Sequence, residues 1–170
     1  MKNLHKILFG ALIFANGAFF SVSSFAETST AAQASSADCH TFAWNLEAAQ
    51  KGNIEAQYDL GMMYFNGDQV KQDHALAMQW LTSAAQQNNI KAQYRLAMVA
   101  EMGIHSTKNA TEAFNWYLKA ANQGYTKAQY KVADAYQTGT GVAQDQVKAQ
   151  EWFKHAANQG NTLAQVALKN

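Results

Sequence analysis

The chain has 170 residues, of which 48% are hydrophobic and 15% are charged, so it can fold around a core and is not disordered as a whole. It contains no proline, which permits a chain that is helical almost throughout. The formal net charge is +1, and a nearly neutral chain lacks the basic surface that nucleic acids or anionic lipids require, so neither is expected as a partner.

The first 26 residues have the pattern of a secretory signal peptide. Lys2 and Lys6 precede an apolar run over residues 7–20, and Ser24-Phe25-Ala26 supplies the small residues of a cleavage site after Ala26. An apolar run of about 14 residues is shorter than the roughly 20 that span a bilayer, which argues against the alternative of a membrane anchor. The sequence therefore predicts export to a Gram-negative-type periplasm or secretion, with no membrane span after cleavage.

Residues 27–39 are mostly small and polar and are expected to form a flexible lead-in. This segment ends in Cys39, which is the one cysteine of the chain and so cannot form an internal disulfide. Cys39 either stays a free thiol or pairs with a second chain. The chain is accordingly predicted to be a monomer, or to self-associate weakly through Cys39 or through the end of the fold described next.

The rest of the chain repeats. The four tryptophans are evenly spaced, 36 residues apart, at Trp44, Trp80, Trp116 and Trp152. The tripeptide Ala-Gln-Tyr recurs with the same period, beginning at Ala56, Ala92 and Ala128. Self-similarity at a fixed period of this length is typical of a solenoid, in which each unit stacks on its neighbours.

Each unit is predicted to contain two helices. In the first unit, the first helix is expected over Ile54–Asn66, where Leu60 and Tyr64 fall on one face. Side chains that can cap a helix start lie near the beginning of each first helix, at Asn53, Asn89, Thr126 and Asn161. Similar residues precede the second helices, at Asp73, Asn109 and Asp145. The second helices end at residues that tolerate a left-handed conformation, at Gly52, Asn88, Gly124 and Gly160.

The second helix is expected to bury a stripe formed by Ala77, Trp80 and Ala84, with the tryptophan filling the space between units. The same reasoning applied to the next unit predicts that Trp116→Ala lowers the free energy of unfolding by about 3–5 kcal/mol.

The segment Gly139-Thr140-Gly141 could suggest a phosphate-binding loop. The corresponding segments of the other units, 67–73 and 103–109, also lie between two predicted helices. A phosphate loop would need a following Lys-Ser/Thr, or a third glycine opening a helix after a strand, and neither is present. The two glycines are therefore predicted to shape a turn.

The residues that recur at equivalent positions of the units resemble the pattern of the Sel-one-like repeat (SLR) family, a subclass of the tetratricopeptide-like α/α solenoids. Unit three matches the family pattern most fully, between Ala128 and Gly160. Unit two departs from it, because Ala97 replaces the helix glycine, Ala100 the tyrosine and Ser106 the valine, so an irregular turn is expected there.

The resemblance covers residues 40–170 and implies an all-α fold, a right-handed α/α superhelical solenoid of 36-residue helix–turn–helix repeats. The expected parts are an N-terminal half-repeat helix, three full repeats and a C-terminal helix, over residues 40–53, 54–89, 90–125, 126–161 and 162–170.

For function, the resemblance implies an exported, non-enzymatic adaptor or scaffold that binds a protein or peptide on its concave face, in envelope or host-contact processes. A cysteine-rich branch of the family has been linked to β-lactam binding or hydrolysis, but that branch staples each unit with a disulfide, and this chain has one cysteine. A secreted hydrolase or binding protein acting on cell-wall material, of the β-lactam or peptidoglycan type, is therefore kept as the alternative.

The family pattern places the first helices on the concave face. The candidate partner-binding residues are Tyr58, Met62, Phe65, Tyr94, Met98, Glu101, Met102, Tyr130, Asp134 and Gln137. The three tyrosines recur with the repeat, so packing against a neighbouring unit is the alternative to binding for them. The positions that differ between units are the better candidates, because packing does not dictate their identity.

No catalytic residue, cofactor site or metal site is predicted. The histidines occupy different phases of the repeat without a His-x-x-x-His spacing, and the Gly-x-Ser-x-Gly motif of a nucleophile elbow is absent from the sequence. Glu101 and Asp134 could be neighbours on the concave face, as carboxylates that perform acid–base chemistry must be, but nothing else in the sequence singles them out.

Overall fold

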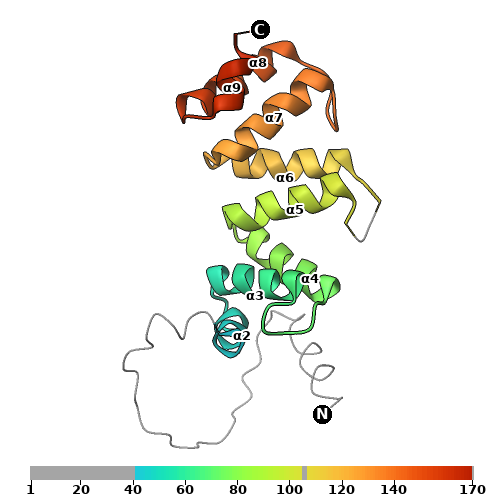
Figure 1. Ribbon diagram of the computed structural model, residues 1–170, viewed down its shortest axis with the longest axis vertical. Helices are drawn as coiled ribbons and strands as arrows, with labels where there is room; N and C mark the ends of the chain where they lie inside the picture. Colours follow the sequence, from blue (N-terminus) through green and yellow to red (C-terminus); the bar gives the residue numbers. More distant parts are fainter. Residues whose placement is uncertain (1–40, 105–106, 170) are drawn as a thin grey trace, which may run out of the picture. The chain divides into compact units, whose positions relative to one another are not determined.

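The computed structural model describes residues 41–104 and 107–169, and every regular element within these ranges is an α-helix (Figure 1). The helices are α2 (Phe42–Gln50), α3 (Ile54–Asn66), α4 (His74–Gln86), α5 (Ile90–Met102), α6 (Ala110–Asn122), α7 (Thr126–Thr138), α8 (Gln146–Asn158) and α9 (Thr162–Ala167). The predicted signal peptide, the lead-in, Cys39 and Ser106 lie outside the described residues. Within those described, no helix is both long and apolar enough to cross a bilayer.

The helices stack in chain order. Helices α3, α5 and α7 are the first helices of three units, and each packs most closely on the second helix of its own unit, α4, α6 or α8. The other substantial contacts join each second helix to the first helix that follows it. Within residues 41–104 and 107–169, α2 has the place of a second helix and α9 that of a first helix. The predicted all-α solenoid is confirmed.

The helix starts follow the predicted capping residues with one exception. The Asn53 side chain accepts a hydrogen bond from the Ala56 N–H at 3.0 Å, and Asn89, Asn161 and the residues before the second helices act in the same way. The capping role expected near Thr126 is wrong. Tyr125 precedes α7 without a side-chain cap, and the Thr126 hydroxyl instead donates to Gln159 at 2.6 Å.

The core is centred one residue away from the tryptophans. Trp80 is 7% exposed, but the other three indoles are only partly buried. The residues that follow the four tryptophans are at most 4% exposed: Asn45, Leu81, Tyr117 and Phe153. Leu81 lies directly against Gly61 of its own unit, whereas Trp116 packs against two separate core clusters. Trp116 and Trp152 each pack against two clusters and so bridge neighbouring units, whereas Trp80 lies within the cluster that includes Leu60 and Tyr64 of its own unit.

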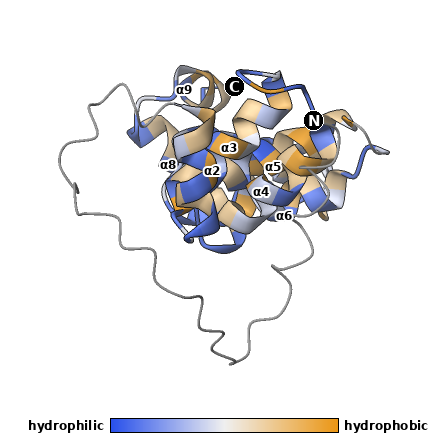
Figure 2. Ribbon diagram, turned by 90° about the horizontal axis from the view of Figure 1, so that it is seen from below, coloured by the Kyte–Doolittle hydropathy of each residue, from blue (hydrophilic) through white to orange (hydrophobic). Residues whose placement is uncertain are grey.

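This division makes every helix amphipathic. Figure 2 shows polar and apolar residues side by side along the same helices, rather than helices that are apolar all round. Small residues line the closest contacts, since Ala77, Ala84 and Ala92 have no exposed surface. Two helices can approach this closely only where neither carries a large side chain.

A column of buried glutamines joins consecutive units. The Gln93 side chain is 1% exposed, donates to the carbonyl oxygen of Ala85 at 3.0 Å and accepts from Gln123 at 2.7 Å. Gln57 and Gln129 make the equivalent bonds in their own units. Ala85 lies in the last turn of the preceding second helix, where a carbonyl has no partner within its helix. The Ala85 carbonyl also accepts from the Asn88 N–H at 3.1 Å, so the glutamine of the Ala-Gln-Tyr motif adds a second hydrogen bond at this helix end.

We expect Gln93→Leu to lower the free energy of unfolding by roughly 1–3 kcal/mol, because two hydrogen bonds of a buried side chain are lost, one to the Ala85 carbonyl and one from the Gln123 amide. The matched control is Gln165→Leu, since Gln165 donates to the equivalent carbonyl of Ala157 at 3.2 Å but is exposed, so water can replace it. Urea unfolding of both variants measures the difference. Equal losses would show that burial of the glutamine is not what matters.

The two glycines of the turn between α7 and α8 have different surroundings. Gly139 and Gly141 both have φ of 76°, in the left-handed region, as a tight turn requires. A Cβ atom on Gly139 would be 3.5 Å from its nearest neighbour, Gln144, which is an ordinary contact. A Cβ atom on Gly141 would be 2.2 Å from the carbonyl oxygen of Ala110, at the start of α6. The turn of unit three therefore rests directly on the backbone of unit two.

The C-terminal end of the stack exposes apolar side chains. Leu163 and Val166 of α9 are 60% and 56% exposed, and among the residues that the structure describes no helix covers them. Self-association through this end is compatible with that exposure and stays a prediction.

Candidate functional site

The ten candidate binding residues lie on the first helices of the three units. We call this set the first-helix row, which consists of Tyr58, Met62 and Phe65 on α3, Tyr94, Met98, Glu101 and Met102 on α5, and Tyr130, Asp134 and Gln137 on α7. None of them is buried, and Glu101, Met102 and Gln137 are exposed. The row can therefore be reached by a partner, and its use as a binding surface stays a prediction.

The three tyrosines of the row pack. The Tyr94 ring centroid lies 5.4 Å from that of Tyr117 and 5.0 Å from that of Tyr125, and Tyr130 lies 5.7 Å from Phe153. Tyr58 packs against the cluster around Leu81 and Leu96. Packing, the alternative kept open for these rings, thus accounts for their recurrence, and only their partly exposed edges are available to a partner.

Two columns of the row differ between units and are never buried: Met62, Met98 and Asp134, and Phe65, Glu101 and Gln137. The columns that repeat are enclosed, as at Ala56, Ala92 and Ala128, which are at most 1% exposed. Close packing restricts the enclosed columns to small residues. Met62, Phe65 and Met98 of the variable columns pack against the core clusters with only part of each side chain, so the part that stays exposed can serve recognition.

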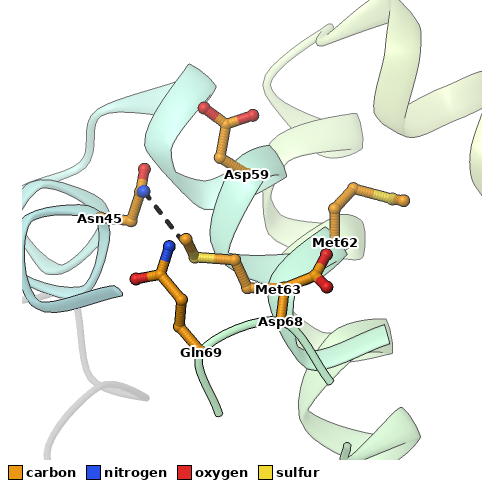
Figure 3. Close-up of a pocket in the computed structure, with 6 residues that line it drawn as sticks. All are labelled: Asn45, Asp59, Met62, Met63, Asp68 and Gln69. Carbon is orange, nitrogen blue, oxygen red and sulfur yellow. Dashed lines mark hydrogen bonds between the residues drawn. The ribbon is translucent and has the colours of Figure 1, made fainter. Parts of the chain in front are cut away.

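One open pocket of about 450 Å³ lies at the N-terminal end of the row (Figure 3). We call it the methionine pocket, and its lining residues are Asn45, Asp59, Met62, Met63, Asp68 and Gln69. The Asn45 amide donates to the Met63 sulfur at 3.8 Å and to the Thr41 carbonyl at 3.1 Å. Two thioethers beside two carboxylates form an adaptable wall with polar anchors, which suits a peptide better than a small rigid ligand.

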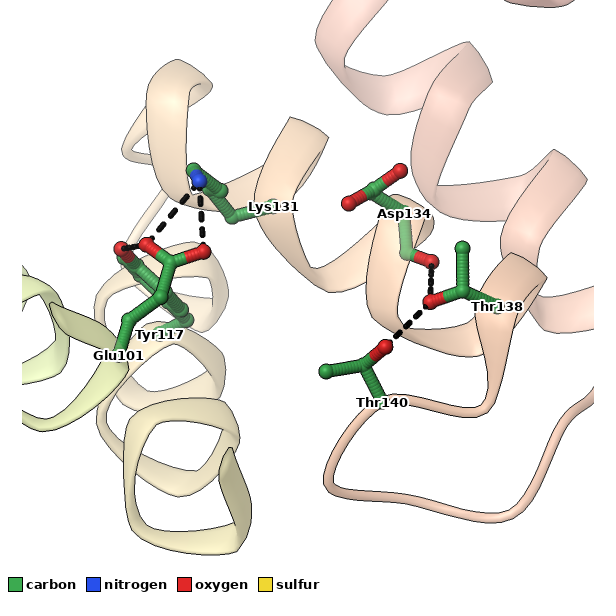
Figure 4. Close-up of polar contacts among 6 residues, drawn as sticks. All are labelled: Glu101, Tyr117, Lys131, Asp134, Thr138 and Thr140. Atoms are coloured by element: carbon green, nitrogen blue, oxygen red, sulfur yellow. Dashed lines mark hydrogen bonds and ion pairs between the residues drawn. The ribbon is translucent and has the colours of Figure 1, made fainter. Parts of the chain in front are cut away.

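A hydrogen-bonded cluster lies at the centre of the row (Figure 4). Lys131 donates to both carboxylate oxygens of Glu101, at 2.8 and 3.0 Å, and the Tyr117 hydroxyl donates to Glu101 at 2.6 Å. The ion pair is partly open to solvent, with the Glu101 side chain 43% exposed, so its contribution to stability is small. Its main effect is to fix the three side chains of α5, α6 and α7 relative to one another.

The cluster also fixes the charges of its members. Burial alone would raise the pKa of Glu101, but the hydrogen bonds from Lys131 and Tyr117 outweigh it and hold this pKa below its ordinary value. Burial, followed by the hydrogen bond to Glu101, raises the pKa of the Tyr117 phenol well above its ordinary value. At neutral pH Glu101 is therefore an anion and Tyr117 a neutral donor.

A second pocket, of about 210 Å³, adjoins this cluster. We call it the Asp134 pocket, and it is lined by Glu101, Lys108, Ala110, Ala113, Phe114, Tyr117, Lys131, Asp134, Ala135 and Thr140. Helix α6 contributes the apolar wall, and α7 contributes Lys131 and Asp134 from the same side of the helix (Figure 4). The Thr138 hydroxyl donates to the main-chain oxygen of Asp134 at 2.9 Å, and this bond leaves the carboxylate of Asp134 open to the pocket.

The structure brings Glu101 and Asp134 to one pocket, as the carboxylate pair considered from the sequence requires. A general acid at neutral pH needs a raised pKa, whereas the pKa of Glu101 is lowered. Among the residues that the structure describes, no three His, Cys, Asp or Glu side chains gather closely enough to hold a metal ion. A lowered pKa keeps Glu101 ionised at neutral pH, so Glu101 does not suit the role of a general acid.

Several residues of these pockets were not among the candidates from the sequence. Asp59, Asp68 and Gln69 line the methionine pocket, and Tyr117 and Lys131 complete the central cluster. Tyr117 and Lys131 lie 16 and 30 residues after Glu101 along the chain, and neither separation matches the 36-residue period. Periodicity therefore gave no signal for them.

Comparison with known proteins agrees with the helical stack. The Sel1 repeat family matches residues 54–89, 90–125 and 126–161, which include the whole first-helix row. A comparison of the sequence with curated proteins finds no match.

Solved structures with the same arrangement include a Sel1 repeat protein from Oxalobacter formigenes, with 38% identity and a TM-score of 0.71 over 74% of this chain and 94% of that one. The protein c5321, a protective antigen present in uropathogenic Escherichia coli strains, has 34% identity and a TM-score of 0.73 over 75% of this chain and 27% of that one. Cysteine-rich protein B of Helicobacter pylori shares the fold at 19% identity, with a TM-score of 0.59 over 76% of this chain and 99% of that one.

Proposed function

The chain belongs to the Sel1 repeat family, and on that premise we propose that it is a non-enzymatic scaffold that binds a protein or peptide partner along the first-helix row. Sel1 repeat proteins are generally scaffolds for protein interactions. The observation that carries the proposal for this chain is the difference between the buried and the partly exposed positions of the repeat. The fully buried positions, such as Ala56, repeat from unit to unit, whereas the partly exposed columns that begin at Met62 and Phe65 change.

The composition of the variable columns supports a peptide-like partner. Met62 and Met98 present flexible, polarisable side chains that adapt to different apolar surfaces. The Arg95 guanidinium lies 5.7 Å from the Phe65 ring centroid, which adds a charged group beside an aromatic face. Surfaces that combine aromatic, methionine and arginine side chains are enriched at the centres of protein interfaces.

We propose in addition that binding takes place outside the cytoplasm, in the periplasm or after secretion. The support is the signal-peptide pattern of the first 26 residues and the cleavage site after Ala26. A partner from the cell envelope follows from this location.

The test is affinity capture from a periplasmic and envelope extract, with a cytosolic extract in parallel. We expect Met62→Ala/Phe65→Ala/Met98→Ala to capture the envelope partner about tenfold less than the unchanged mature chain, because truncation of central apolar side chains costs more than 1 kcal/mol at each hot spot. The control is Asn115→Ala/Glu151→Ala/Lys154→Ala, three exposed residues of the second helices, which should capture normally.

Circular dichroism and thermal unfolding of both triple variants establish that each is folded. Equal capture by the first-helix triple variant and the unchanged chain would exclude the first-helix row as the binding surface. Enrichment of the partner from the cytosolic extract alone would instead contradict the proposed location.

A further inference from the structure

The Asp134 pocket combines an apolar wall with a carboxylate that forms no ion pair with any residue that the structure describes. We propose that it receives one basic side chain, arginine or lysine, from the bound peptide, with Asp134 as its ion-pair partner. The inference rests on the proposed function and assigns to one pocket of the first-helix row a definite chemical preference.

The size of the pocket fits one long side chain. Its volume of about 210 Å³ is below the roughly 300–1,000 Å³ of sites for small-molecule ligands. An arginine or lysine side chain fits a narrow pocket, because it is a long, unbranched hydrocarbon stem with its charge at the end.

The walls of the pocket suit that stem. Ala110, Ala113 and Phe114 of α6 face Ala135 of α7, so the space between the two helices is lined by apolar surface. Basic side chains lay their methylene groups along such surfaces and keep the charge at a polar rim. The Phe114 ring is held in place by an edge contact with Tyr136, with the ring centroids 5.3 Å apart.

The charges of the pocket favour a cation beside Asp134. Lys131, the nearest lysine on the same helix, is committed to Glu101 through two hydrogen bonds. Within the part of the chain that the structure describes, no lysine or arginine forms an ion pair with the Asp134 carboxylate. Lys108 is the remaining cation of the lining, and it is exposed, so it opposes an incoming cation without neutralising Asp134.

Two substitutions should therefore act in opposite directions. Asp134→Asn removes the counter-ion and should weaken binding of a basic side chain about fivefold, as expected for one partly exposed ion pair. Lys108→Ala removes the competing positive charge and should strengthen binding about twofold. Glu151→Gln, which makes the same carboxylate-to-amide change on an exposed face of α8, is the matched control and should change nothing.

The probe is the tripeptide acetyl-Gly-Arg-Gly-amide, titrated into the ¹⁵N-labelled mature chain and followed by NMR. Its counterpart with citrulline has the same shape without the charge. We expect saturable shifts of the Phe114, Tyr117 and Asp134 amide signals with the arginine peptide at millimolar concentrations, and weaker binding of the citrulline peptide and in added salt.

Equal affinity for the two peptides would overturn the inference, as would an unchanged affinity in Asp134→Asn or the lack of a saturable shift. Well-dispersed spectra of each variant would show that it is folded, which is expected because Lys108 is exposed and Asp134 is only partly buried. These failures would leave the capture experiment unaffected. Equal capture of the partner by the two triple variants would contradict the proposed function. The preference of the pocket for arginine would then be judged from the peptide titration alone.

Discussion

Replacement of Trp80 by alanine is expected to lower the free energy of unfolding by about 3–5 kcal/mol, the range found when large aromatic side chains are removed from a core. Trp80 is 7% exposed and packs in a cluster with Leu60, Tyr64 and Ala77. It is the one fully buried tryptophan among the four. Ala77 has too small a side chain to fill the cavity that the indole would leave.

The control for this prediction is Trp116→Ala. The sequence alone assigns the same cost to Trp116, but in the structure its indole is partly buried and the Lys119 ammonium lies 4.1 Å from its ring centroid. We therefore expect a smaller loss, of about 1.5–3 kcal/mol. Urea unfolding followed by circular dichroism measures both. A loss at Trp116 that equals or exceeds the loss at Trp80 would contradict the assignment of the core.

Gly141→Ala is expected to destabilise the protein by about 2–5 kcal/mol, although it adds a single methyl group. Part of the loss comes from the left-handed φ of 76°, which costs an L-residue roughly 1–2 kcal/mol. The larger part comes from the Ala110 carbonyl, which would be 2.2 Å from the new carbon atom. That contact involves backbone of the preceding unit, so it can be relieved only by moving the turn away from α6.

Gly139→Ala separates these two effects. Gly139 has the same φ, but a Cβ atom there would make an ordinary contact at 3.5 Å. We therefore expect a loss of about 1–2 kcal/mol for this variant, which is the conformational cost alone. Thermal and urea unfolding of the two variants give the difference. If Gly139→Ala were as damaging as Gly141→Ala, the close approach of the turn to α6 would not be the cause.

The regular part of the fold follows from local chemistry, and it could be predicted. The expected first helix over Ile54–Asn66 coincides with α3, because the capping Asn53 and the left-handed Gly67 act on adjacent backbone. Prediction at Thr126 failed because the backbone of Tyr125 begins the helix without any side-chain cap, so the polar residue beside it was free to bond elsewhere. Local rules identify where a helix can begin, but not which of two adjacent residues begins it.

The pattern of the core and of the pockets depends on the angle at which helices meet. Periodicity identified the recurring tryptophans but not that Leu81 and Phe153, one position further on, are the more deeply enclosed. The row of Met62, Glu101 and Asp134 could be proposed because these residues break the repeat. The bonds of Glu101 to Tyr117 and Lys131 could not, because they depend on side-chain direction across three helices.

Because each helix has substantial contacts only with the helices before and after it, the stack behaves as a one-dimensional lattice. Among the described helices, α2 and the short α9 each have a single substantial neighbour, so unfolding of this stack should begin at these two helices and proceed inward. A peptide that binds to α5 and α7 together would hold the second and third units of the stack in place. Such a peptide would reduce local unfolding of the helices on both sides of its binding site, without a change in the conformation of the protein.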